Sequence, residues 1–357
     1  MWSAVWFVLP RHRWIICVWL LLLGGLVGYL RAEVAKPPKI VHQGTRVIRV
    51  DRPSDPASQA RGVITGWMER VIPKREAGLY AGMLYGNATF SKDDKAMYRD
   101  AGLTHLVAVS GSNVAMVLEA ILFVAVATRL RASARFYISM IAISSFAMFA
   151  GMSSSVARAG WLACLSLYAR HLGRLPHPAH LLLVVASGMA MLDPWIVRYD
   201  AGYALSFCAG WGMIVWSPLI VDWLPESFAP WLKEAIAGTT AATATTTTYL
   251  LYAFRQFTPY SLIANVLAAP MVPVAMGVSA LSVVIGALRL PASLFISSLL
   301  WPAIWIETVA DWVSSFPGAH VLAGSWWWQI SAVVWLLAEW WRKNRGKQNG
   351  DISSMQR

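Results

Sequence analysis

The sequence has few charged residues and few cysteines. Charged side chains make up 13% of the 357 residues, about half of the roughly 25% that soluble domains carry. The three cysteines lie within apolar runs, so nothing indicates a disulfide framework. Hydrophobic residues make up 57%, and apolar runs of about 20 residues, long enough to cross a bilayer, recur along the chain. A soluble protein is thereby close to excluded.

Two motifs that support enzyme chemistry are also missing from the chain. There is no G-x-x-x-x-G-K-[ST] phosphate-binding loop, so no ATPase motor is expected. The nearest group of histidines is His171, His177 and His180, which lie in a basic loop without a carboxylate between them. Solvated side chains explain this group better than metal ligands do. The sequence predicts no catalytic residues, no metal site and no cofactor.

The apolar runs predict an all-α polytopic membrane protein with about ten transmembrane helices (8–11), some broken or re-entrant, and a short polar outer segment. The predicted spans are 14–30, 103–128, 136–152, 155–170, 179–195, 202–221, 236–254, 260–288, 292–316 and 325–341. Basic residues before the first span place the N-terminus in the cytoplasm. Counting spans then puts two basic loops and the basic C-terminal tail on that side too, as the positive-inside rule expects.

Four segments follow from this pattern. They are a cytoplasmic tip with a membrane anchor (1–30), a short extracytoplasmic segment (31–75), a membrane domain (76–341) and a basic cytoplasmic tail (342–357). The alternating piece "TRVIRV" in the second segment predicts a strand. Two short amphipathic helices are expected between residues 79 and 100, the second with Ser91 as its N-cap.

The formal net charge of +12 has two interpretations. Cytoplasmic loops of membrane proteins carry excess lysine and arginine, which also contact anionic membrane lipid. A basic protein also attracts a polyanion such as nucleic acid. Charge alone leaves both open.

The stretch "GLTHLVAVSGSNVAMV" places polar side chains at the start of an apolar run. Its candidate residues are His105, Ser110, Gly111, Ser112 and Asn113. Glycine and serine permit the helix to unwind or another backbone to approach, and freed backbone groups at membrane depth must be buried in protein or line water. Close packing of helices through small residues is the alternative.

Three further stretches break the apolar pattern. An arginine in "SSVARAGWL" faces either a polar interior or, by snorkelling, the membrane surface. "DPWIVRYDAGYALSFCAGWG" contains serine and glycine in a helix, and a threonine-rich run precedes a span interrupted by asparagine and proline, as in transport pathways. The candidate pathway residues here are Arg158, Ser206, Thr243, Thr247, Asn265 and Pro270.

Four of these stretches, in order, resemble the membrane domain of ComEC-type competence proteins. They are "GLTHLVAVSGSNVAMV", "SSVARAGWL", "DPW…YALSFCAGWG" and "SLIANVLAAPMVPVAM", and the resemblance covers about residues 75–340. It implies an inner-membrane channel that brings single-stranded DNA into the cytoplasm during natural transformation. The implied partners are a DNA receptor, a motor ATPase, a separate nuclease and further copies of the chain.

The resemblance has two departures. The family usually has "SGLH" at residues 110–113, so Asn113 replaces a histidine. Full-length members also carry an oligonucleotide-binding-like domain and a metallo-β-lactamase-like domain. Residues 31–75 are too few for a complete five-stranded barrel, and no H-x-H-x-D-H cluster is present. We therefore expect a short form of the family without a nuclease.

Two other functions compete with a DNA channel. A small-solute transporter would also use broken helices. An intramembrane hydrolase would pair Ser110 with His105, but a helix would put residues five apart on different faces, and no third partner is evident. The DNA channel explains the basic outer segment best, because lysine and arginine gather phosphates.

Overall fold

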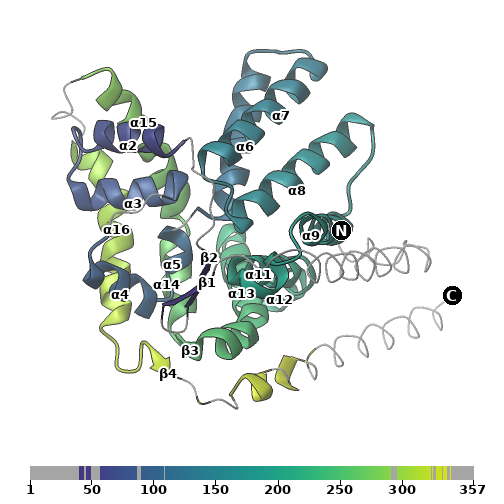
Figure 1. Ribbon diagram of the computed structural model, residues 1–357, viewed down its shortest axis with the longest axis vertical. Coiled ribbons are helices and arrows are strands. Elements are labelled where there is room, and N and C mark those ends of the chain that lie inside the picture. Colours follow the sequence, from purple (N-terminus) through teal and green to yellow (C-terminus); the bar gives the residue numbers. More distant parts are fainter. Residues whose placement is uncertain are drawn as a thin grey trace.

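The structure, a computed structural model, is built almost entirely of helices (Figure 1). It describes residues 40–43, 46–49, 57–86, 90–107, 109–290 and 296–322, together with 324, 327–331, 333–335 and 338. Strands within these residues form two small antiparallel sheets, β1 with β2 and β3 with β4. The predicted all-α class is confirmed. The predicted tip and anchor (1–30) and the tail (342–357) lie outside the described residues.

A hairpin and four helices come first in the described chain. Their bounds are β1 (Ile40–Gln43), β2 (Arg46–Arg49), α2 (Ser58–Met68), α3 (Lys74–Tyr85), α4 (Lys92–Asp100) and α5 (Thr104–Val107). The strand predicted in "TRVIRV" is β2, and Ile40 pairs with Arg49. Ser91 caps α4 as predicted, because its hydroxyl accepts from the Asp94 amide at 3.0 Å and the Asp94 carboxylate accepts from the Ser91 amide.

In a second group of helices, elements that follow one another in the chain pack on each other, and the group lies together in Figure 1. The bounds are α6 (Gly111–Ala127), α7 (Ala132–Phe149), α8 (Ser154–His171), α9 (Pro178–Leu192), α10 (Ile196–Tyr199), α11 (Ala201–Val215), α12 (Ser217–Trp223) and α13 (Pro230–Phe254). Short turns make α6, α7 and α8 antiparallel neighbours, and α8 contacts both α9 and α11. The N-terminal ends of α6, α8 and α11 therefore lie on one side.

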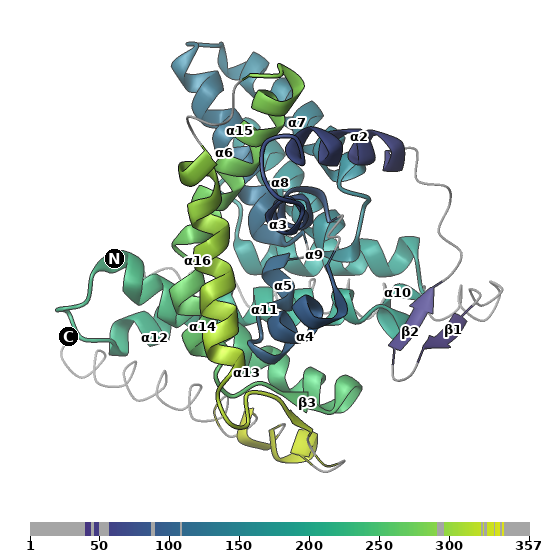
Figure 2. The same ribbon diagram turned by 90° about the vertical axis from the view of Figure 1, so that its left-hand side faces the viewer.

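The last described elements return to the first ones. They are β3 (Gln256–Phe257), α14 (Ser261–Ala268), α15 (Met271–Ala287), α16 (Ile296–Ser314) and β4 (Val321–Leu322). Helix α15 packs on α2 and α3, and α16 packs on α3 and α4, although some 200 residues separate them in the sequence (Figures 1 and 2). Buried Tyr80 of α3 fixes this arrangement, since its hydroxyl donates to the Leu299 carbonyl of α16 at 2.5 Å.

Two of the long apolar segments are broken. Helices α11 and α12 meet at 44°, and α14 and α15 meet at 53°. Pro270 lies at the second bend, where a proline removes a backbone donor from the helix. The break expected within 260–288 is therefore present, and the bend between α11 and α12 is a further one that the sequence did not indicate.

The expectation of about ten spans is not confirmed. Within the described residues, α7 alone is a single helix both long and apolar enough to cross a bilayer, and the number rises to three if each bent pair is one span. Helices α6 and α9 are apolar but only 17 and 15 residues long. Arginines in α8 and seven threonines in α13 make those helices less apolar than a lipid-facing span.

Candidate functional site

The predicted interruption of the first polar stretch is present between α5 and α6. Helix α5 ends at Val107, and α6 begins at Gly111 after Ser110, whose backbone is extended. The Ser112 hydroxyl donates to the Ser110 hydroxyl at 2.5 Å, and Ser110 in turn donates to the Asn113 side-chain oxygen at 2.9 Å. These polar side chains therefore pair with one another at the start of α6, and Ser110 makes no side-chain cap bond to the helix backbone.

Arg158 lies inside the protein, near the start of α8. Only 9% of this residue is exposed, and its Nη1 donates to the Ser206 carbonyl of α11 at 2.7 Å. The guanidinium carbon is 5.9 Å from the centre of the Phe207 ring, within the range of a cation–π contact. Snorkelling to the membrane surface, the alternative interpretation of this arginine, is excluded by its burial.

Two glycines make room for the guanidinium. A Cβ on Gly111 would lie 2.5 Å from Nη2 of Arg158, and a Cβ on Gly210 would lie 2.9 Å from Nη1. Gly111 therefore allows a close approach of α6 to a charged side chain, which is a more specific role than the flexibility expected from the sequence. The structure thus brings together Gly111, Arg158 and Ser206 from three of the four polar stretches.

The N-terminal ends of three helices meet at this point. Ser154 opens α8, and its hydroxyl donates to the carboxylate of Asp200, which caps α11, at 3.2 Å. The Ser155 and Ser206 hydroxyls lie 3.3 Å apart, and α6 reaches Arg158 through Gly111. Helix N-termini carry partial positive charge, so they add to the charge of Arg158, and Asp200 offsets one unit of it.

Asn113 attaches this site to α3. The side chain is 2% exposed, and its amide donates to the Met83 carbonyl while its oxygen accepts from Ser110. Asparagine thus uses both donor and acceptor at the position where the resemblance expects a histidine.

The threonines of α13 serve a different contact. Thr247 donates to the Thr243 carbonyl of its own helix at 2.7 Å. Thr245, which the sequence did not single out, donates to the Cys208 carbonyl of α11 at 2.9 Å. Gly212 leaves room for this threonine, since a Cβ on Gly212 would lie 2.5 Å from the Thr245 hydroxyl oxygen. Small residues therefore join α13 closely to α11, as at membrane helix interfaces.

The other predicted site residues lie apart from Arg158. His105 is exposed on α5. Asn265 is buried and donates to the Ser261 carbonyl within α14 at 2.8 Å, and Pro270 lies at the α14–α15 bend. Within the described residues, no hydrogen bond joins these three residues to Arg158. The structure therefore separates them from the site formed by α6, α8 and α11.

Sequence reasoning missed Phe207 and Gly210. Ser206 and Gly210 are four residues apart on α11, a spacing that places them on one face of a helix. Since Ser206 was a candidate, this spacing was the available signal for Gly210. Phe207 carried no comparable signal, because aromatic residues are frequent throughout the chain.

The geometry gives no support to a serine–histidine pair. Within the described residues, the Ser110 hydroxyl bonds to Ser112 and Asn113, and His105 is not among its partners. In the same part of the chain, no three His, Cys, Asp or Glu side chains are grouped so that they could hold a metal ion.

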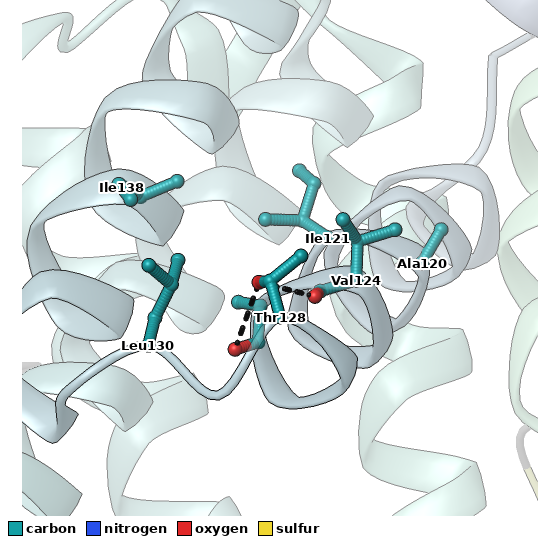
Figure 3. Close-up of a pocket in the computed structure, with 7 residues that line it drawn as sticks. Ala120, Ile121, Val124, Thr128, Leu130 and Ile138 are labelled. Atoms are coloured by element: carbon teal, nitrogen blue, oxygen red, sulfur yellow. Dashed lines mark hydrogen bonds between the residues drawn. The ribbon is translucent and has the colours of Figure 1, made fainter.

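A hollow of about 320 Å³ lies elsewhere, at the turn between α6 and α7 (Figure 3). Its lining is almost wholly apolar, and Thr128 uses its hydroxyl to bond the Val124 carbonyl at 2.7 Å. A hollow with so little polarity offers nothing to orient a charged ligand.

An exposed apolar surface and broken apolar helices define this chain as a membrane protein. The family model described as "Competence protein" matches residues 83–343, well over half of the chain. The chain therefore belongs to the competence protein family, which confirms the resemblance seen in the four stretches, all of them inside the matched region. No curated protein and no solved structure matches the chain.

Proposed function

We propose that this protein is a channel component through which single-stranded DNA crosses the cell membrane during natural transformation. In this proposal the chain crosses the cytoplasmic membrane several times, with both termini in the cytoplasm. Membership of the competence protein family supports a role in competence and DNA uptake. The site around Arg158 supports the more specific role of conducting a polyanion.

The observation that carries the proposal is a buried arginine enclosed between the N-terminus of α6, at Gly111, and the middle of α11, at Ser206 and Gly210. Arg158 makes one hydrogen bond to Ser206, and its Nε has no hydrogen-bond partner in the described part of the chain. Leaving a buried polar group unpaired costs about 1–3 kcal/mol, and more for a charged group. A phosphate oxygen would satisfy that donor, and helix N-termini favour the same ligand.

Passage of a strand requires this site to open. Arg158 is 9% exposed, and α6 contacts it through Gly111 while α11 contacts it through Ser206 and Gly210. A strand could reach the guanidinium only if α6 and α11 moved apart. The break before Gly111 and the small residues on α11 are features that permit such a movement.

The proposal includes partners. With no phosphate-binding loop in the sequence, we assign the driving force to a separate motor ATPase and strand degradation to a separate nuclease. A DNA receptor would deliver the strand, membrane lipid would surround the apolar helices, and several copies of the chain could form the channel.

Transformation frequency tests the proposal. Arg158→Leu should reduce transformation by at least tenfold while the protein remains in the membrane at normal amount. Arg170→Leu is the matched control, since Arg170 is exposed at the other end of the same helix and should tolerate the change. Equal transformation by the two variants would contradict a role for Arg158 in DNA passage.

A small-solute transporter is the second candidate. The enclosed guanidinium between two glycines suits a single small anion, and the bent pair α14–α15 is typical of transporters. Under this alternative, a strain lacking the protein would transform normally and would fail to accumulate an anionic solute.

A further inference from the structure

A second group of polar side chains lies away from Arg158, where α3 and α4 pack on α16, with Glu307 and Tyr98 buried and Arg75 half-exposed. Nη1 of Arg75 is 3.3 Å from Oε2 of Glu307 on α16. The same guanidinium holds Asp94 of α4 more firmly, with Nη2 at 2.9 Å and Nε at 3.1 Å from one carboxylate oxygen. The Arg75 guanidinium therefore pairs with two carboxylates, and its contact with Glu307 is the longer and weaker one.

Glu307 is buried with incomplete pairing. The residue is 8% exposed, and its Oε1 has no hydrogen-bond partner in the described part of the chain. Tyr98 of α4 is 2% exposed, and its hydroxyl is also unpaired, as is Oε2 of Glu76 on α3. Three helices thus each contribute one buried and unpaired oxygen atom.

The titratable groups around Glu307 lie on α3 and α4, which pack against α16, and on α16 itself. These groups are Arg75, Glu76 and Tyr80 on α3, Asp94 and Tyr98 on α4, and exposed Asp311 on α16 itself. Helices α14 and α15 also pack on α16 but contain no ionisable side chain. Glu76, Asp94 and Glu307 together carry three negative charges, and Arg75 supplies one positive charge.

A buried carboxylate with one unpaired oxygen and two negative neighbours is costly in its charged form. A proton removes the charge and converts the carboxyl group into a hydrogen-bond donor. We propose that Glu307 is a proton-binding site whose occupancy sets how tightly the N-terminal end of α3 is held to α16. When Glu307 binds a proton, Arg75 keeps its stronger bonds to Asp94 and its contact with α16 is lost, while the Tyr80–Leu299 bond remains.

Helix α3 connects this proton site to the Arg158 site. Arg75 lies in its first turn, and the Met83 carbonyl in its last turn accepts from Asn113, two residues after Gly111. Loss of the Arg75–Glu307 contact at one end of α3 gives that helix more freedom to shift, and the shift is passed to the break at its other end. This step rests on the proposed channel function, and it makes opening of the site easier at acidic pH.

Labelling with N,N′-dicyclohexylcarbodiimide tests the proton site without any DNA. The reagent adds to protonated carboxyl groups shielded from water, and mass spectrometry of a digest locates the adduct. We expect Glu307 to be modified in the purified protein, with the initial rate falling roughly tenfold per pH unit on the alkaline side of its titration. Exposed Glu226 and Glu234 provide internal controls and should not react.

Two variants of Arg75 sharpen the test. Arg75→Gln removes the neighbouring cation, so labelling of Glu307 should persist to higher pH, whereas Arg75→Lys keeps the charge and should shift the profile less. Only variants that elute as a single species in detergent would be compared. Absence of labelling at Glu307 at every pH, or a rate indifferent to pH, would overturn the proton site.

Transformation at several external pH values tests the connection to the channel separately. Glu307→Gln should make transformation less dependent on pH than it is in the unmodified protein. An unchanged pH dependence would overturn the connection through α3. Because labelling requires no DNA, a failed Arg158 experiment with intact Glu307 labelling would remove the channel role and leave the proton site standing.

Discussion

Gly111→Ala is the smallest change that tests the geometry of the Arg158 site. The new Cβ would lie 2.5 Å from Nη2 of Arg158, whereas ordinary contacts of a Cβ begin at 3.4 Å. The guanidinium must therefore move by about 1 Å. Such a shift is enough to stretch its 2.7 Å bond to Ser206 beyond the 3.2 Å limit of a normal hydrogen bond.

The size of the effect follows from these contacts. Overpacking of a filled site costs about 1–3 kcal/mol. Loss of a hydrogen bond made by a charged donor costs about 1.5–3 kcal/mol, although the guanidinium keeps part of it by rotating. Because the clashing Nη2 is the end of a flexible side chain, the cost lies at the low end of these ranges. We expect Gly111→Ala to destabilise the folded protein by about 1 kcal/mol.

A double-mutant cycle separates this mechanism from a general effect on α6. Heat unfolding of the purified protein in detergent, followed by tryptophan fluorescence, should show a lower midpoint for Gly111→Ala. In an Arg158→Ala background the same change should cost nearly nothing, because the clashing group is gone. Gly188→Ala in α9 is the control, since no atom lies within 4 Å of its new Cβ and the midpoint should hold or rise. Equal losses in both backgrounds would refute the reasoning.

Three more outcomes are expected. Gly286→Ala should prevent α15 from packing on α2, because the new Cβ would clash with the Trp67 backbone carbonyl. Circular dichroism and limited proteolysis between α2 and α3 would detect the loss. Gly277→Ala is the control and should have no effect, because no atom lies within 4 Å of its new Cβ. Burial tends to raise the pKa of Asp94, but hydrogen bonds from Ser91 and the charge of Arg75 outweigh it and hold that pKa below its usual value. The stabilising effect of the Asp94 carboxylate is therefore present above the pKa of an unfolded aspartate, about 3.9, and is lost as pH falls through the lower folded value. Asp94→Asn should lower the free energy of unfolding at pH 7 and make it less dependent on pH between pH 5 and 2. The purified protein should neither hydrolyse ATP nor cleave DNA. Residues 31–102 carry 13 Lys and Arg against 8 Asp and Glu, so they should bind single-stranded DNA weakly. A fluorescence titration should show that this affinity falls steeply as the salt concentration rises.

Features set by neighbouring residues were predictable from the sequence. The break before Gly111, the Ser91 cap of α4, the strand β2 and the bend at Pro270 each depend on the local chemistry of a few residues. The four polar stretches also identified the family correctly. Local hydrogen bonding and backbone restriction decide such features before any tertiary contact forms.

Features set by distant contacts were not predictable in this way. Hydropathy could not show that α2 packs on α15 or that Arg75 reaches Glu307, because those partners are more than 200 residues apart. The role of Gly111 was also out of reach, since it depends on where the Arg158 side chain points. The number of spans is not confirmed within the described residues, because a run of apolar residues does not reveal where a helix ends within it.

Photocrosslinking to DNA during uptake tests the central claim most directly, namely that a strand passes the junction of α6, α8 and α11. A photoreactive amino acid would replace Ser112, which is exposed beside the site, or Ile141, which is 67% exposed on α7. The proposed channel predicts crosslinks from position 112 to labelled single-stranded DNA and none from position 141. Crosslinks from neither position, or equally from both, in cells that take up DNA normally would contradict it.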